Sequence, residues 1–261
     1  MSKTTSEKTR PLLEARGIIK RYGQVEALGG ADFTVYPGEV VSLIGDNGAG
    51  KSSLVKILSG AIQHDGGQLL LDDVEISPRR PSDMQDLGIE TVYQDLALAP
   101  ELSASANLYL GREILKKGPR GWFGVLDNKK MLSQAVESFN RLGVNLRDPR
   151  SAVANLSGGQ RQSVAVARAA VWATKLIILD EPTAALGVEQ TARVLDLIKR
   201  VRDSGISVVL ISHNMPDVLA VSDRIEVLRL GKRVAQFTAG NVRSDDLIGA
   251  MTGATTFEGA K

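Results

Sequence analysis

The sequence contains no cysteine among its 261 residues, and only 4% of its residues are aromatic. Without cysteine the chain forms no disulfide and no thiolate-bound metal site, which fits a reducing compartment. Lys and Arg number 32 against 30 Asp and Glu, so the overall charge gives no sign of a nucleic-acid or acidic-lipid partner. The hydrophobic content of 43% is typical of a folded globular protein and too high for a disordered one.

Long hydrophobic runs are also missing. The longest are "LIIL" at 176–179 and "VVLI" at 208–211, far below the roughly 18 residues that span a bilayer. The polar start "MSKTTSEKTR" has no apolar core after it, so it is not a secretory signal. We therefore expect a soluble chain that reaches a membrane only through a partner. Residues 1–11 read as a flexible arm, and the C-terminal segment 241–261 is uninformative.

Strand and helix patterns alternate along much of the chain. Short β-prone pieces broken by glycines fill 12–38, and "QLLLDDVEI" reads as one further strand region. Later, "KLIILD", a helix at 188–203, "SVVLIS" and a hairpin that turns at Gly231–Lys232 follow one another. This order predicts a parallel sheet covered by helices. A helical pattern at about 95–160 predicts an inserted lobe, which includes a helix capped by Asp127 and ended by Gly143.

The stretch "GDNGAGKS" satisfies the phosphate-loop pattern G-x-x-x-x-G-K-[ST] between an apolar strand and a helix. Its glycines let backbone N–H groups converge on phosphate oxygens, and the helix N-terminus and Lys51 add positive charge. Ser52 is the expected Mg²⁺ ligand. The alternative is a glycine-rich turn with a capping serine. The predicted nucleotide-binding residues here are Gly45, Asp46, Asn47, Gly48, Ala49, Gly50, Lys51, Ser52 and Ser53.

Two adjacent carboxylates, Asp180 and Glu181, end the strand "KLIILDE". In a parallel sheet the strand ends open onto the ligand crevice, so both side chains are expected to face the phosphate loop. One carboxylate would hold the metal shell, and the next would orient a water for attack on the γ-phosphate. His213 ends another expected strand and points to the same crevice, although an isolated strand-end histidine is more often structural. His64 reads as a surface residue.

Six features in this order, Tyr22, "GDNGAGKS", Gln94, "LSGGQ", "LIILDE" and His213, resemble the ATP-binding subunits of ABC transporters across residues 12–240. The resemblance implies an α/β fold, the P-loop NTPase ABC cassette. Such a cassette has a mostly parallel sheet flanked by helices, an N-terminal antiparallel β lobe and an inserted helical lobe. It also implies ATP and Mg²⁺ as cofactors.

The resemblance assigns a role to each matching residue. Tyr22 corresponds to the aromatic ring that stacks on adenine. Gln94 corresponds to the glutamine that touches Mg²⁺ and the attacking water and links the core to the helical lobe. Asp180 resembles the metal-shell aspartate, Glu181 the catalytic base, and His213 the histidine that contacts the γ-phosphate.

Locally, "LSGGQ" reads as a capping box, because Ser157 and Gln160 have the S-x-x-Q spacing at a helix start. A cap does not need Gly158 and Gly159, which cost roughly 1 kcal/mol each relative to alanine. The glycines leave bare N–H groups that a phosphate can approach. In the family this segment faces the γ-phosphate bound by the other subunit of a head-to-tail dimer, so all four residues are predicted nucleotide contacts.

One departure concerns "EPTAALG", where Ala184 and Gly187 stand at the serine and aspartate positions of the family's S-A-L-D loop. Importers for ribose, xylose and fructose have similar "TAAL" loops, and the fructose type has a single cassette. The resemblance thus implies a homodimer at the cytoplasmic face of the inner membrane, with two transmembrane permease subunits and an extracytoplasmic sugar-binding protein. Residues 95–114 lie where the family contacts the permease. The alternatives are a soluble ABC ATPase, an importer of another small solute, and a degenerate cassette that only binds ATP.

Overall fold

A six-stranded sheet forms the centre of the protein, with strand order β10-β9-β3-β8-β7-β6. All neighbouring strands pair in parallel except β9 and β10, which confirms the expected mostly parallel sheet. The computed structural model describes residues 10–255, so most of the predicted arm 1–11 and the last residues of the C-terminal segment lie outside the described part. The strands are β3 (Val40–Ile44), β6 (Ile89–Val92), β7 (Leu176–Asp180), β8 (Ser207–Ile211), β9 (Arg224–Arg229) and β10 (Lys232–Thr238).

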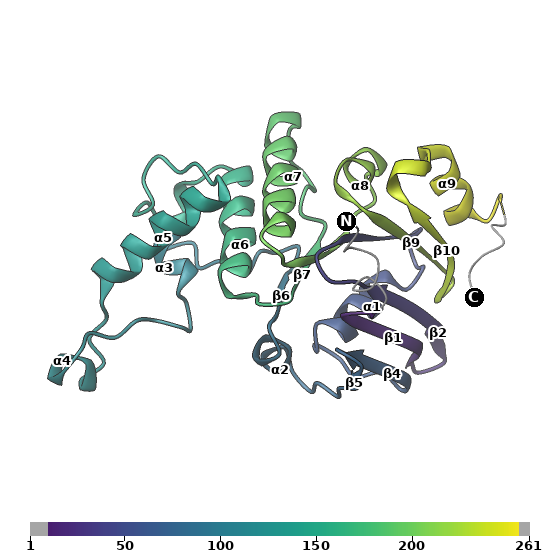
Figure 1. Cartoon of the computed structure of the whole chain (residues 1–261), viewed down its shortest axis with the longest axis horizontal. Helices are drawn as coiled ribbons and strands as arrows, with labels where there is room; N and C mark the ends of the chain where they lie inside the picture. The colour runs from purple at the N-terminus through teal and green to yellow at the C-terminus, as the bar shows by residue number, and fades with distance from the viewer. Residues whose placement is uncertain (1–9, 256–261) are drawn as a thin grey trace, which may run out of the picture.

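Both faces of the sheet are buried at its centre, because side chains of β7 and β8 alternate between two hydrophobic clusters. Ile177 and Leu179 of β7 pack on one face with residues of helices α6 (Gly158–Trp172) and α7 (Val188–Asp203). Ile178 packs on the other face with α1 (Lys51–Leu58) and the second sheet. In Figure 1, α7 lies on one side of β7 and α1 lies on the other. The sheet is therefore the rigid base that carries the polar residues at the strand ends.

The second sheet is antiparallel, with strand order β2-β1-β4-β5, and confirms the expected N-terminal β lobe. Its strands are β1 (Leu13–Tyr22), β2 (Val25–Val35), β4 (Gly66–Leu71) and β5 (Val74–Glu75). The expected short pieces in 12–38 are in fact two long strands whose register shifts near Gly17 and Gly29. The single strand expected at "QLLLDDVEI" is a hairpin instead, because Asp72 and Asp73 both adopt positive φ.

Arg224 ties the two sheets together from β9. Its guanidinium donates to Glu39 at 2.7 Å, to Glu226 and to the backbone oxygen of Thr34 on β2. Burial raises the pKa of Glu226, and the charges of Arg224 and Arg233 oppose that shift. The β lobe is thereby fixed on the central sheet, which matters because its first hairpin carries Tyr22.

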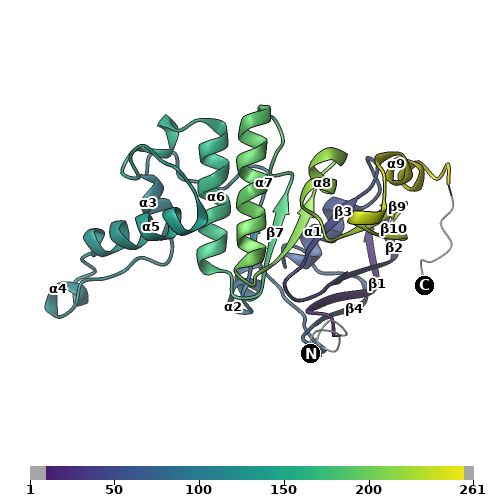
Figure 2. The ribbon, with the colours of Figure 1, turned by 45° about the horizontal axis from the view of Figure 1, so that its top comes forward.

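The chain between β6 and β7 forms a helical lobe that extends to one side of the sheet (Figure 2). Within it, α5 starts at Asp127, whose carboxylate accepts from the Lys130 N–H, and ends at Gly143 with φ 71°, as expected. The tip at α4 lies farthest from the two sheets in both views. The lobe comprises α3 (Ala104–Leu108), α4 (Pro119–Trp122), α5 (Asn128–Leu142), η2 (Val153–Asn155) and α6.

Four further elements complete the described chain: α2 (Pro81–Asp86), α8 (Met215–Val221), η3 (Ala239–Asn241) and α9 (Ser244–Thr252). The fully buried Leu247 of α9 packs in a cluster with Ile225 and Val227 of β9, so much of the uninformative C-terminal segment packs on the core. The β9–β10 hairpin turns at Leu230 and Gly231, one residue earlier than expected, because both adopt positive φ. Among the helices of residues 10–255, none combines the length and the apolar character that a membrane crossing needs.

Candidate functional site

The phosphate loop leaves β3 after Ile44 and enters α1 at Lys51. Two of its glycines are required by their surroundings. A Cβ at Gly45 would collide with the backbone oxygen of Leu228, and Gly50 has φ 102° with a Cβ position 2.7 Å from the Ala27 oxygen. The loop is thus packed closely against β2 and the β9–β10 turn. The Asn47 and Ala49 N–H groups donate to Asp46 within the loop, at 2.8 Å and 3.1 Å.

Lys51 curls over the loop that precedes it. Its Nζ donates to the backbone oxygens of Gly45 at 2.7 Å and Asp46 at 3.1 Å. Burial lowers the pKa of Lys51, and the negative charges of Glu181, Asp46 and Asp180 oppose that shift. The ammonium therefore lies within the electrostatic reach of both predicted carboxylates, where a phosphate would compete for the same N–H donors.

The ends of β7 and β8 bring three predicted residues together. The Glu181 N–H donates to the Ile211 oxygen at 2.9 Å, and His213 Nδ1 lies 2.9 Å from Glu181 Oε1. Glu181 is a non-glycine residue with φ 53°, a conformation that costs energy and is common at functional sites. Burial and the Glu181 charge raise the pKa of Asp180, while Lys51 opposes this. A cation beside Asp180 would favour its ionised form.

Tyr22 lies at the end of β1, in the hairpin that borders the phosphate loop. The Gly231 N–H donates to Ala49 of the loop at 2.9 Å, and the Gly231 oxygen accepts from Gly29 of β2 at 3.1 Å. The Tyr22 ring is 47% exposed, and Lys20 Nζ lies 5.7 Å from its centroid. The ring is thus accessible to solvent, with a cation near it. Its contact with adenine stays a prediction.

Gln94 is exposed and lies two residues after the end of β6, so it lies at the same sheet edge as the other strand-end residues. Two residues farther, Leu96 and Ala97 adopt positive φ of 61° and 44°. Arg168 of α6 stabilises this turn, because its guanidinium donates to the Ala97 oxygen at 2.8 Å and to the Leu96 oxygen at 3.1 Å. The sequence did not indicate Arg168, since 71 residues separate it from Ala97.

Replacing Arg168 with Ala is expected to destabilise the protein by about 1–3 kcal/mol, because the partly buried Leu96 carbonyl and the exposed Ala97 carbonyl both lose their donor. It should also lower ATPase activity by roughly 10-fold, because the loop that holds Gln94 is no longer held in position. Arg168→Lys should recover only part of the activity, since one ammonium replaces a two-pronged donor. Thermal unfolding and steady-state phosphate release measure both effects. Arg141→Ala, an exposed arginine of α5, is the matched control, and equal losses in both variants would contradict this role.

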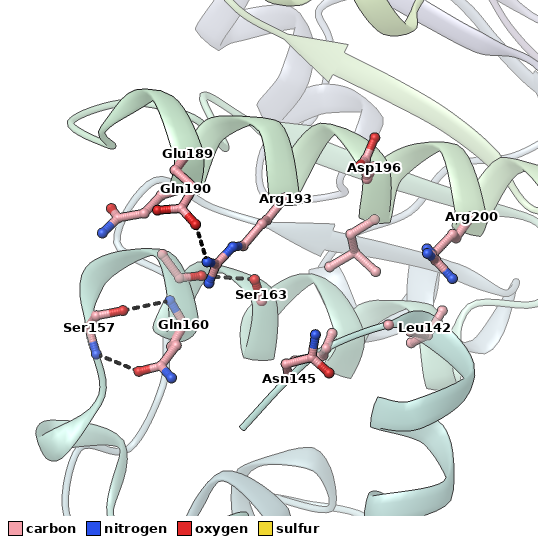
Figure 3. Close-up of a pocket in the computed structure, with 14 residues that line it drawn as sticks. Leu142, Asn145, Ser157, Gln160, Ser163, Glu189, Gln190, Arg193, Asp196 and Arg200 are labelled. Atoms are coloured by element: carbon pink, nitrogen blue, oxygen red, sulfur yellow. Dashed lines mark hydrogen bonds and ion pairs between the residues drawn. The ribbon is translucent and has the colours of Figure 1, made fainter. Parts of the chain in front are cut away.

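The "LSGGQ" segment forms the predicted capping box at the start of α6 (Figure 3). Ser157 Oγ accepts from the Gln160 N–H at 3.3 Å, and Gln160 Oε1 accepts from the Ser157 N–H at 3.0 Å. The segment borders a pocket of about 370 Å³ whose walls come from α5, α6 and α7. Residues 45–52 do not line this pocket, so the segment and the phosphate loop of one chain do not share it.

Gly158 and Gly159 differ in whether the fold itself requires glycine. A Cβ at Gly159 would lie 2.9 Å from Gln190 Cβ, so the close packing of α6 on α7 requires glycine there. A Cβ at Gly158 would meet only Leu186 at 3.7 Å, an ordinary contact, and its φ is not positive. Within the chain, Gly158 therefore has room for a side chain. A substitution there would mainly restrict access to the Gly158 N–H.

Comparison with known proteins agrees with these features. The ABC transporter profile matches residues 28–184, and the fructose import ATP-binding protein FrcA of Rhizobium meliloti is 52% identical over 94% of this chain and 95% of its own length. The chain belongs to the ABC transporter family. The ribose import ATP-binding protein RbsA 1 of Rubrobacter xylanophilus is 43% identical over 94% of this chain, which spans 47% of that protein.

Solved structures of ABC cassettes have the same fold. The ADP conformation of MJ1267, an ATP-binding cassette of an ABC transporter, has a TM-score of 0.78 and 26% identity, over 94% of this chain and 100% of its own. The P-loop cassette fold expected from the sequence is confirmed, and the chain is an ATPase of this family.

Proposed function

We propose that this chain hydrolyses ATP to drive the import of a monosaccharide through a membrane permease. The observation that carries the proposal is the convergence of Lys51, at the start of α1, with Asp180, Glu181 and His213 at the ends of β7 and β8. Similarity to fructose and ribose import ATP-binding proteins supports the substrate class. The ATPase domain is assigned to 12–240, with the helical subdomain at about 95–160, between an arm at 1–11 and a segment at 241–261.

The oxygen donors of the site suit Mg²⁺ bound together with a nucleotide. Ser52, Gln94 and Asp180 offer a hydroxyl, an amide oxygen and a carboxylate, which a small hard cation prefers. Among residues 10–255 there is no cluster of three acidic or histidine side chains that would enclose a metal by itself. The donor set therefore fits an ion that keeps water and phosphate oxygens as its remaining ligands. Bound Mg²⁺ would neutralise charge that develops on the phosphates.

Within this site Glu181 is assigned as the general base. Its carboxylate would accept a proton from the attacking water, and the contact with His213 fixes its orientation. His213 is 73% exposed, so its ring can reach a γ-phosphate while it remains beside Glu181. Lys51 and the loop N–H groups stabilise charge on the phosphates, Gln94 contributes to water and metal contacts, and Tyr22 stacks on the base.

The working form is proposed to be a head-to-tail homodimer. Two observations support this: residues 45–52 do not line the pocket beside "LSGGQ", and Gly158 has room for a side chain beside it. A second copy would then bring its bare Gly158 N–H to the nucleotide of the first. Gly187 has no carboxylate at the aspartate position of the family's S-A-L-D loop, so that side chain cannot couple the two sites of this dimer.

A groove of about 300 Å³ supports docking of a permease segment, at the cytoplasmic face of the inner membrane. Its walls come from α2, β6, the loop after Gln94, the chain after α3, and α6. Arg168 lines this groove and also donates to the loop after Gln94. A permease segment bound in the groove would therefore affect the position of Gln94 through Arg168. A sugar-binding protein outside the cell would deliver the substrate to the permease.

Uptake measurements test the proposal. Cells in which this gene is deleted should lose uptake of one labelled monosaccharide among fructose, ribose and xylose. Wild-type protein should restore uptake, whereas Glu181→Gln should not. Purification of the tagged chain from native membranes should recover a permease. Unchanged uptake of all three sugars, or recovery without any membrane protein, would favour a different solute or a soluble ABC ATPase.

A further inference from the structure

Two adjacent aromatic residues at the tip of the helical lobe are almost fully exposed. Trp122 is 88% and Phe123 is 87% exposed, in a chain with only two Trp and five Phe. Large aromatic side chains normally lie in a core or an interface, because burial of their apolar surface is favourable. Within residues 10–255 this tip has no surface against which the two rings pack, so both rings are available to a partner surface.

The tip is a closed hairpin with defined geometry. Leu115 and Leu126 form an isolated antiparallel bridge, and the Lys116 N–H donates to the Val125 oxygen at 2.9 Å. Three apolar residues of this hairpin are 39–48% exposed and extend the apolar surface from the rings toward the lobe. They are Leu115, Val125 and Leu126. We call residues 114–126 the hairpin tip.

Charge within the hairpin tip has one sign. Lys116 and Lys117 are exposed, Arg120 adds a third basic residue in the sequence, and 114–126 contains no Asp or Glu. The nearest acids, Glu113 and Asp127, stand where the hairpin joins the lobe. The balanced charge of the whole chain therefore conceals a local cationic and aromatic cluster. This is the composition of segments that rest in the interface of an anionic bilayer, where rings enter the headgroup region and ammonium groups pair with lipid phosphates.

The position of the hairpin tip also fits a membrane. Gly111 and Arg112, which precede it by two to three residues, line the groove assigned above to the permease, and Gln85 of α2 lines the same groove. In both views α2 and α4 lie along the same lower edge of the molecule (Figures 1 and 2). A chain docked on a permease by this groove would thus hold the hairpin tip near the lipid surface beside the permease. This step rests on the proposed function.

We propose that the hairpin tip is a membrane foot, which inserts Trp122 and Phe123 into the headgroup region of an anionic leaflet with Lys116 and Lys117 at the level of the phosphates. The foot would hold the helical lobe against the bilayer while the rest of the cassette moves.

Purified full-length protein and vesicles test this surface directly. Binding to phosphatidylcholine vesicles that contain phosphatidylglycerol should be at least about 10-fold tighter than to phosphatidylcholine alone, and high salt should weaken it. Tryptophan emission should shift to the blue on binding, and Trp122 is the residue that reports it. The other tryptophan, Trp172, is already half-buried and donates to the Leu108 oxygen at 2.7 Å.

Four variants define the outcome. Trp122→Ser with Phe123→Ser, and Lys116→Glu with Lys117→Glu, should each lower vesicle binding about 10-fold and leave basal ATPase activity unchanged. Trp122→Phe should keep binding but lose the emission shift. Val74→Ser changes another exposed apolar residue, 64% exposed and outside the hairpin tip, and should have no effect.

Equal vesicle binding by wild type and the two double variants would overturn the proposal, as would no preference for anionic vesicles. A different outcome is that the wild type fails to bind vesicles and copurifies with a permease that the Trp122 and Phe123 double variant loses. In that case the hairpin tip contacts protein, and the lipid proposal is wrong. Failure of sugar uptake in the gene-deletion test would contradict the proposed function, whereas vesicle binding needs neither sugar nor permease. The two failures are therefore distinguishable.

Discussion

Glu181→Gln is expected to lower the rate of ATP hydrolysis by roughly 10²–10⁴-fold, the range that a general base contributes. The amide keeps the shape of the side chain and an oxygen that His213 Nδ1–H can reach, but it cannot accept the proton of the attacking water. ATP binding should persist, because Lys51 and the phosphate loop are unchanged. The variant should therefore accumulate as an ATP-bound dimer.

Phosphate release and size-exclusion chromatography with and without ATP measure these two effects. Glu75→Gln, which changes an exposed glutamate of β5 in the other sheet, should leave both at the wild-type level. If Glu181→Gln leaves the hydrolysis rate unchanged, Glu181 is not the general base. In that case the orientation of water would have to be assigned to another group near Lys51.

Gly158→Asp is expected to lower hydrolysis roughly 10²-fold, comparable to the loss of one donor that stabilises transition-state charge. The new carboxylate would occupy the space through which a phosphate approaches the Gly158 N–H and would repel it. Folding should not suffer, because the structure leaves room for a Cβ there and an acidic residue in the first turn is favourable for α6. ATP binding to the chain's own phosphate loop should also remain.

Gly159→Ala is the informative comparison for this prediction. A Cβ there lies 2.9 Å from Gln190 Cβ, so the variant should lose about 1–3 kcal/mol of stability through overpacking. Thermal unfolding should thus separate the two positions: Gly159→Ala melts earlier, whereas Gly158→Asp melts near the wild type. If Gly158→Asp unfolds as early as Gly159→Ala, its loss of activity reports damage to the fold instead of a blocked phosphate contact.

The parts that the sequence predicted best are those that neighbouring residues determine. The phosphate loop, the strand that ends in Asp180 and Glu181, and the capping box at Ser157 each rest on a few consecutive residues and their flanks. The expected helix over 128–142 was confirmed for the same reason, since Asp127 and Gly143 mark its two ends.

The parts that were missed depend on contacts between distant segments. Arg168 holds Leu96 and Ala97 across 71 or more residues, and no local pattern marks an arginine for that task. The requirement for glycine at 159 comes from Gln190 on another helix. The hairpin tip reads as ordinary helical-lobe sequence until the structure shows that Trp122 and Phe123 have no core to enter.

The central claim is that one chain cannot complete its own catalytic site. Lys51→Ala disables the phosphate loop of a chain. Gly158→Asp disables the "LSGGQ" segment with which the chain contacts its partner's nucleotide. Each variant alone should be almost inactive. In an equal mixture half of the dimers are mixed, and each mixed dimer keeps one intact loop opposite one intact segment. The mixture should therefore show about a quarter of the wild-type rate if the two sites work independently. A mixture as inactive as its components would contradict the claim, because a site made within one chain cannot be restored by exchange.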